Sequence, residues 1–201
     1  MKKVFFLFIF PIIAFGQTEL DSIEKLRVAD SIIQAITMKM DSSFKLLNKK
    51  IELKNIAEEK FNNGDYYGAI SDYTKIIELD PDDNYVYEDY YNRAVVKSKL
   101  GDNYGAISDY TNAAEINPDY YDAYVNLSIN KSLINDHLGA IIDICKAIEL
   151  DPKNAKGYKI RGLAFMGFQG KPIKSQKCSD FRKSCDLGDE NACKYYSEYC
   201  P

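Results

Sequence analysis

Four cysteines near the C-terminus are the side chains whose type and spacing most clearly allow chemistry. Cys178, Cys185, Cys193 and Cys200 follow one another at intervals of 7, 8 and 7 residues. Four thiols of this kind can form two disulfides or hold a zinc ion. Structural zinc sites usually take their thiolates in pairs about two to four residues apart, and no such pair occurs here. The spacing therefore predicts disulfides, and no metal or cofactor is expected.

Helix geometry decides how the four cysteines pair. Residues 177–201 are predicted to form a hairpin of two helices, with its turn between Cys185 and Cys193. Two cysteines seven residues apart in one helix are about 10.5 Å apart along its axis, which is too far for a disulfide. In an antiparallel hairpin, Cys185 meets Cys193 beside the turn, and Cys178 meets Cys200 two helical turns away.

The remaining reactive residues form no catalytic set. The chain has one histidine, His137, which is predicted to be exposed in a turn. No serine or cysteine nucleophile has a base beside it, and the sequence contains no phosphate-binding loop and no set of metal ligands. Cys145 is expected to be an unpaired, partly buried thiol. These observations predict a protein that is not an enzyme.

The charge balance argues against two classes of partner. The chain has 26 basic and 30 acidic residues. Removal of residues 1–16 would take away two lysines and no acid, which leaves a net charge of −6. An acidic chain without basic clusters is poorly suited to nucleic acids and to anionic membranes. Neither partner is expected.

The N-terminus has the pattern of an export signal. Lys2 and Lys3 precede an apolar run over residues 4–15, and Ala14 and Gly16 are small residues at the two positions that a signal peptidase reads. The pattern predicts a signal peptide over residues 1–16, cleavage before Gln17, and an exported protein that is periplasmic or secreted. A membrane anchor is the alternative, but a span needs about 20 apolar residues. No cysteine lies near the cut, so no lipid anchor is expected.

Residues 17–49 are predicted to be helical, because apolar side chains recur at steps of three and four. Asp-Ser pairs at three points favour helix starts, so the region forms either one long helix or several shorter ones. Two interpretations of the stripe remain open. It covers the open edge of the following domain, or it forms a coiled-coil homodimer through residues 18–52. The stripe consists of Leu20, Ile23, Leu26, Ile33, Ile36, Met40, Phe44, Leu47 and Ile51.

A repeated segment organises the rest of the chain. Residues 64–74 read GDYYGAISDYT, and residues 101–111 read GDNYGAISDYT, with one difference between them. Residues 139–141 begin a weaker third copy. A fixed period of this kind predicts stacked helical units, since one unit cannot bury its apolar face alone. An apolar helix and a proline follow each copy, at Pro81, Pro118 and Pro152.

These segments resemble tetratricopeptide repeats. The resemblance covers residues 50–186 and implies an all-α fold, a right-handed α-solenoid of antiparallel helix pairs called A and B. Near Gly170 about three extra residues enter the pattern. The tail around Cys185 to Cys193 resembles cysteine-rich Sel-like repeats, whose helix pairs are stapled by disulfides. The predicted repeats span residues 50–83, 87–120, 121–154 and 155–187.

Single positions within the repeats have physical roles. A pairing of Arg93 with Asp109 is expected to join helix A to helix B. A residue of left-handed conformation is favoured just past helix A, at Gly64, Gly101 and Asn135. Small residues let helix A approach helix B closely, at Ala57, Ala94, Ser128 and Gly162.

The resemblance implies a concave groove lined by helix A. Three asparagines share one repeat position there, namely Asn55, Asn92 and Asn126. In peptide-binding members of the family, an asparagine at this position bonds the backbone of an extended ligand, because an amide offers a donor and an acceptor. The neighbouring inward positions form an apolar floor with cations at both ends. The other predicted groove residues are Tyr91, Val95, Lys99, Val125, Ile129, Leu133, Lys159 and Leu163.

The resemblance therefore implies a non-enzymatic interaction scaffold or adaptor of the cell envelope, which binds an extended peptide or a partner helix in this groove. The alternative is a structural envelope protein that self-associates and uses the repeats as a spacer. The clamp that some family members use for a C-terminal carboxylate is not reproduced, because Glu58 and Asp122 occupy its asparagine and lysine positions.

Overall fold

The computed structural model describes residues 6–168 and 174–200, and it describes side chains from residue 23 to 168 and from 176 to 200. Every regular element in these ranges is an α-helix. The chain divides into two compact units, residues 1–49 and residues 50–201. The helices are α1 (Phe6–Asn62), α2 (Tyr66–Leu79), α3 (Val86–Leu100), α4 (Asn103–Ile116), α5 (Tyr121–Leu133), α6 (His137–Leu150), α7 (Ala155–Gly167), α8 (Lys174–Asp186) and α9 (Glu190–Tyr199).

Residues 6–49 of the first unit are helical without a break, since α1 begins at Phe6 and continues past residue 49. Of the two predicted arrangements, the structure has the single long helix. Its apolar side chains are exposed, from Ile23 at 50% to Met38 at 72%. The start of the predicted signal peptide, residues 1–5, lies outside the described residues, and cleavage before Gln17 stays a prediction. Within the described ranges, none of the helices combines the length and the apolar character that a membrane span requires.

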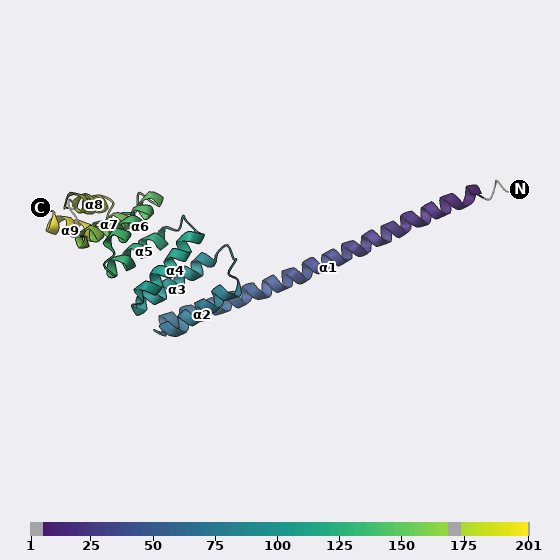
Figure 1. The fold of residues 1–201 in the computed structure, drawn as a ribbon, viewed down its shortest axis with the longest axis horizontal. Coiled ribbons are helices and arrows are strands. Elements are labelled where there is room, and N and C mark those ends of the chain that lie inside the picture. The colour runs from purple at the N-terminus through teal and green to yellow at the C-terminus, as the bar shows by residue number, and fades with distance from the viewer. Residues whose placement is uncertain (1–5, 169–173, 201) are drawn as a thin grey trace. The chain divides into compact units, whose positions relative to one another are not determined.

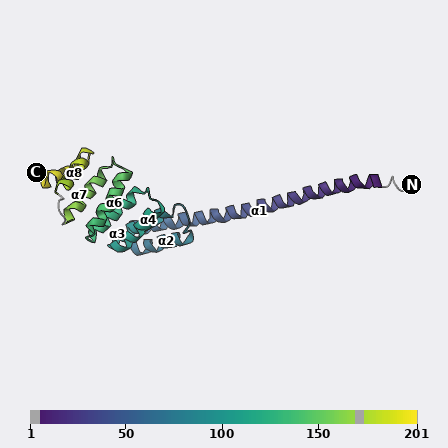
Figure 2. The ribbon, with the colours of Figure 1, turned by 45° about the horizontal axis from the view of Figure 1, so that its top comes forward.

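The second unit is an all-α solenoid of antiparallel helix pairs, in which successive helices lie side by side (Figures 1 and 2). Residues 50–62 of α1 pair with α2, and the following pairs are α3 with α4, α5 with α6, and α7 with α8. Alanines allow the helices to approach closely, since Ala94, Ala106 and Ala113 are completely buried. Tyr110, 2% exposed, fills the space between two pairs. The predicted fold class is confirmed.

Repeated caps determine where these helices begin and end. The Asp102 side chain accepts a hydrogen bond of 2.9 Å from the Gly105 amide at the start of α4, and Asp65 and Asp136 do the same for α2 and α6. Such a bond satisfies an amide that has no partner in the first helical turn. The predicted left-handed turns are also confirmed, with φ of 81° at Gly64, 87° at Gly101 and 64° at Asn135.

Gly101→Ala is expected to lower the free energy of unfolding by about 1 kcal/mol, because a Cβ atom is strained at this positive φ. The strain is purely local, since nothing lies within 4 Å of the added Cβ. Urea unfolding followed by circular dichroism measures the change. Ser108→Ala, at an exposed position of α4, is the control and should stay within about 0.5 kcal/mol of the wild type. Equal stability of the two variants would contradict the expectation.

Each helix pair is also joined by an acid–base pair, in which the aspartate side chain is at most 12% exposed. The cation stands on helix A and the aspartate on helix B, with N–O distances between 2.5 and 2.8 Å. Burial alone would raise the pKa of Asp72, but hydrogen bonds from Lys60 and Lys75 outweigh it and hold that pKa below its usual value. The predicted Arg93–Asp109 contact is confirmed. The four pairs are Lys60–Asp72, Arg93–Asp109, Lys131–Asp143 and Arg161–Asp180.

The last repeat ends in a stapled hairpin, because its second helix, α8, also pairs with α9. The Cα atoms of Cys178 and Cys200 are 5.6 Å apart, those of Cys185 and Cys193 are 4.7 Å apart, and both sulfur pairs are at bonding distance. The fold thus includes the disulfide-stapled hairpin that the cysteine spacing predicts. Phe181 of α8 is completely buried. The predicted insertion at residues 170–172 lies outside the described residues.

Candidate functional site

The first helix of each repeat contributes to one surface, which we call the A-helix face. It is formed by residues 50–62 of α1 and by α3, α5 and α7. Side chains of neighbouring A helices contact each other across it. Lys54 Nζ lies 3.4 Å from Glu88 Oε2, and Asn126 Nδ2 donates a hydrogen bond of 3.0 Å to the Tyr91 hydroxyl. The face is therefore continuous from one repeat to the next.

The three predicted asparagines stand on this face in different environments. Asn55 is exposed, whereas Asn92 and Asn126 are half-buried. Asn126 is held on two sides, because its side chain bonds Tyr91 and its main-chain carbonyl accepts a hydrogen bond of 2.9 Å from Asn130 Nδ2. One of its two amide protons is already used, so Asn126 presents an oxygen acceptor and one donor to a ligand.

Tyr91, which accepts the hydrogen bond from Asn126, belongs to a cluster of tyrosine rings. The ring of Tyr91 lies 4.9 Å from that of Tyr120 and 5.5 Å from that of Tyr110, between centroids. Tyr120 also meets the ring of Tyr87 edge-on at 5.2 Å. Burial raises the pKa of the Tyr91 phenol above its usual value, so the hydroxyl stays neutral at physiological pH and can accept the bond from Asn126. These ring contacts position the Tyr91 hydroxyl for the hydrogen bond from Asn126.

The apolar side chains of the A-helix face range from half-buried to exposed. Val95 and Ile129 are half-buried and pack against the repeat cores. Leu133 is 61% exposed and Leu163 is 39% exposed. Leu133 lies seven residues after Asn126 on α5, and residues seven apart share one side of a helix. The face thus carries an accessible leucine on the same side as the fixed amide.

Val125 does not belong to the accessible surface, and its prediction as a groove residue is wrong. Its side chain is completely buried and packs with Ile144, Ala147 and Ile160. The reason is that α5 lies against both α6 and α7 at this position. Val125 therefore stabilises the junction of two repeats and cannot contact a ligand.

The charges at the far end of the face differ from the prediction. Lys99 is exposed, but Lys159 Nζ lies 2.5 Å from Asp189 Oδ2. Burial would raise the pKa of Asp189, but hydrogen bonds from Lys159 and the Ala192 amide hold it below its usual value. The ammonium of Lys159 is therefore neutralised within the chain. The predicted cation at this end is not available to an acidic group of a partner.

His137 is not the exposed turn residue that the sequence predicts. It is half-buried at the start of α6, and its ring lies against the backbone of Gly167, where an added Cβ would be 2.2 Å from His137 Cε1. The imidazole occupies the space that Gly167 leaves open, which is a packing role. Among the described residues, no group of three or more His, Cys, Asp or Glu side chains could hold a metal ion.

Sequence reasoning missed the hydrogen bond between Tyr91 and Asn126. The two residues are 35 positions apart, which is about one repeat length. That separation places them on neighbouring A helices, but many other pairs share it. Only the relative rotation of α3 and α5 decides that these two side chains meet.

Comparison with protein families matches the first two repeats. A sequence model of the tetratricopeptide repeat matches residues 55–83 and 90–120. A search of curated proteins finds no match. The matched residues cover the first two helix pairs of the solenoid, where the repeated segment is most regular.

Solved structures share the fold of this chain. MamA, residues 41 to the end, from Desulfovibrio magneticus RS-1 has a TM-score of 0.66 at 18% identity, over 74% of this chain and 81% of that one. A tetratricopeptide repeat protein from Parabacteroides merdae has a TM-score of 0.65 at 17% identity, over 71% and 55%. The first such domain of Spaghetti (RPAP3), bound to the HSP90 peptide SRMEEVD, has a TM-score of 0.55 at 26% identity, over 59% and 92%.

Proposed function

We propose that this chain, which has the tetratricopeptide-repeat fold, is a non-enzymatic interaction scaffold of the cell envelope that binds an extended peptide on its A-helix face. The fold is that of protein–protein interaction scaffolds. The observation that carries the proposal is that the fixed amide of Asn126 and the exposed Leu133 lie on the same side of α5, two helical turns apart. The envelope location rests on the predicted signal peptide and on cysteines at disulfide distance, which suit an oxidising compartment.

The geometry of the A-helix face suits the backbone of an extended segment. A peptide group has one donor and one acceptor, and Asn126 retains one of each. Because Tyr91 and Asn130 already hold this side chain and its backbone, little conformational freedom is lost on binding. Leu133 and Leu163 offer contacts to aliphatic side chains. Because Lys159 is already paired with Asp189, we do not expect it to bind an acidic group at the end of the partner peptide.

Leu133→Asp is expected to weaken binding of a selected peptide at least about ten-fold, since a desolvated carboxylate would face the apolar side chains of the ligand. The peptide would be selected from a displayed library of random extended sequences against the wild-type protein. Isothermal titration calorimetry then measures its Kd for each variant. Leu133 is exposed, so the substitution leaves the fold intact.

Ile142→Asp is the matched control. Ile142 is 63% exposed on the B helix α6, against 61% for Leu133 on the A helix α5, so the two changes are alike except in position. The control should bind as the wild type does. Loss of binding in Ile142→Asp with retention in Leu133→Asp would place the site on the B helices and refute the proposal.

A second candidate function is structural self-association through residues 18–52. The exposure of the apolar side chains along α1, from Ile23 to Ile51, favours it.

A further inference from the structure

The exposed apolar side chains of α1 follow a seven-residue spacing. Of the exposed large apolar residues in the described chain, half lie between Ile23 and Ile51. In heptad notation, Leu26, Ile33, Met40 and Leu47 all fall at position a, at intervals of seven residues. An apolar residue at position a in three successive heptads favours a helix that pairs with another helix, although only one of the three d positions is a large apolar residue. The d positions between them are Ala29, Ile36 and Ser43.

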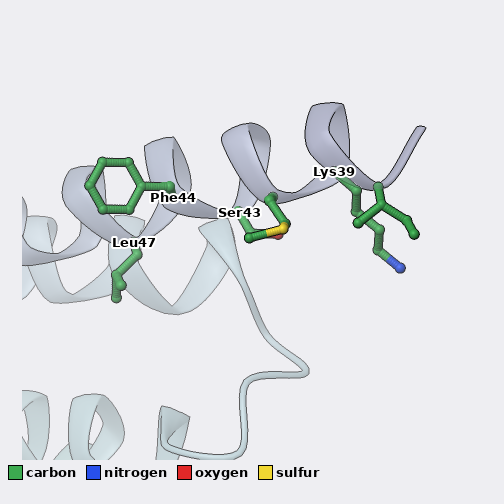
Figure 3. A pocket seen from close by; sticks show the side chains of 6 residues that line it. Lys39, Ser43, Phe44 and Leu47 are labelled. Atoms are coloured by element: carbon green, nitrogen blue, oxygen red, sulfur yellow. The ribbon is translucent and has the colours of Figure 1, made fainter. Parts of the chain in front are cut away.

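The surface of α1 is hollowed where such a pairing requires it. A hollow on this helix (Figure 3) is lined by six side chains, those of Ile36, Lys39, Met40, Ser43, Phe44 and Leu47. In coiled coils, each a or d side chain of one helix enters a hole formed by four residues of the other. The hole for Met40 of a second copy is formed by Ile36, Lys39, Met40 and Ser43, and all four line this hollow. The hollow thus has the position and the lining of an unfilled coiled-coil hole.

The side chains that flank the stripe distinguish a parallel from an antiparallel pair. In a parallel pair in register, each g residue meets the e residue five positions later on the partner. That rule brings Lys25 to Asp30, a pair of opposite charges, and Leu46 to Ile51, a pair of apolar residues. It also brings Ile32 to Thr37 and Lys39 to Phe44. In an antiparallel pair, g faces g and e faces e.

The antiparallel arrangement matches these flanking residues poorly. If the antiparallel helices are aligned so that residues 26–47 overlap, Lys25 would face Leu46 and Asp30 would face Phe44. Each charge would then be desolvated without a partner, which costs free energy. Parallel pairing avoids both of these contacts and gives Lys25 a partner of opposite charge; its one unmatched charge is Lys39, which meets Phe44.

The composition of α1 also argues against a membrane surface as the partner of its apolar side chains. Residues 17–49 contain five basic and five acidic side chains, so this region has no net charge. Helices that lie on anionic membranes usually carry a surplus of lysine and arginine on their polar face. A second copy of the chain fits the stripe better.

We propose that residues 25–47 of α1 pair with the same residues of a second copy as a parallel, in-register, two-stranded coiled coil. The pairing specifies the self-association named as the second candidate function and does not depend on peptide binding by the A-helix face. Both repeat units then follow the same end of the paired helices. A dimer of this kind carries two A-helix faces, one on each repeat unit.

The first test is the mass of the purified protein in solution, measured by sedimentation equilibrium. The wild type is expected to be a dimer, and Met40→Asp a monomer. Met38→Asp is the matched control, because Met38 is 72% exposed against 66% for Met40 and lies on the opposite side of the helix. A monomeric wild type, including one that instead pellets with phosphatidylethanolamine–phosphatidylglycerol vesicles, would overturn the proposal, as would a monomeric Met38→Asp control.

The second test is the direction of the two helices. Leu26→Cys and Ser43→Cys are made singly in a Cys145→Ser background and oxidised under mild conditions, because these two positions would face each other in the antiparallel pair described above. A parallel pair joins each variant to itself. Cross-linking only in the mixture of the two variants would show an antiparallel pair and overturn the orientation.

Charge substitutions test the register. Lys25→Asp should weaken the dimer about five-fold at low salt, because two symmetric ion pairs become repulsive. Addition of Asp30→Lys to the same chain should restore the affinity. Failure of the second substitution to restore it would overturn the register.

Discussion

Asp109→Ala is expected to lower the free energy of unfolding by about 3–5 kcal/mol, because it leaves a buried guanidinium without its partner. Asp109 is 2% exposed, and it accepts hydrogen bonds of 2.8 and 2.7 Å from Arg93 Nε and Nη2. Lys97 Nζ lies 2.8 Å from the same carboxylate. Loss of the carboxylate therefore leaves two cations close together. Urea unfolding followed by circular dichroism would measure the shift.

Two further variants show whether the effect comes from loss of the Arg93–Asp109 pair or from loss of any aspartate. Asp119→Ala removes an exposed aspartate and should change stability by less than about 0.5 kcal/mol. Arg93→Leu combined with Asp109→Leu removes both charges and should recover much of the loss, as replacement of buried pairs by apolar residues often does. If Asp109→Ala proves as stable as Asp119→Ala, the pair contributes little to the fold.

Loss of the wider disulfide is the second large effect expected. Cys178→Ser with Cys200→Ser should lower the free energy of unfolding by about 3 kcal/mol, because a bridge across a separation of 22 residues restricts the unfolded chain. The narrower bridge, Cys185 to Cys193, spans 8 residues and should contribute about 2.5 kcal/mol. Thermal unfolding with and without a phosphine reductant would show both contributions as a lower Tm.

Cys145→Ser is the control for these measurements. Its thiol is free and accepts a contact of 3.4 Å from Arg161 Nη1, which a serine hydroxyl can replace. The variant should keep the Tm of the wild type and the full response to reductant. A Tm that does not move on reduction, although the four hairpin thiols can be titrated, would show that the bridges do not stabilise the fold.

The repeat architecture was predictable because each unit solves the same physical problem with the same residues. Gly64 and Gly101 end helix A in the left-handed region, and the prolines after helix B prevent its continuation. The disulfide pairing followed from helix geometry alone, since only an antiparallel hairpin brings Cys178 to Cys200. These features depend on positions close in sequence or on a fixed period.

The candidate site was less predictable because its accessibility depends on contacts between distant segments. Val125 occupies a groove position in the repeat alignment, yet α6 and α7 cover it. Lys159 is neutralised by Asp189 of the hairpin, 30 residues away and beyond the fourth repeat. A repeat alignment assigns each residue to a position within one repeat. It does not show whether a neighbouring repeat or the C-terminal hairpin covers that residue.

The acid–base pair inside each helix pair has an evolutionary consequence. Both members of a pair belong to the same repeat, as Arg93 and Asp109 do in the second. Duplication or deletion of one whole repeat in the gene therefore adds or removes a complete pair and leaves no charge stranded in the core. The near-identity of residues 64–74 and 101–111 is what a recent duplication of this kind would leave behind.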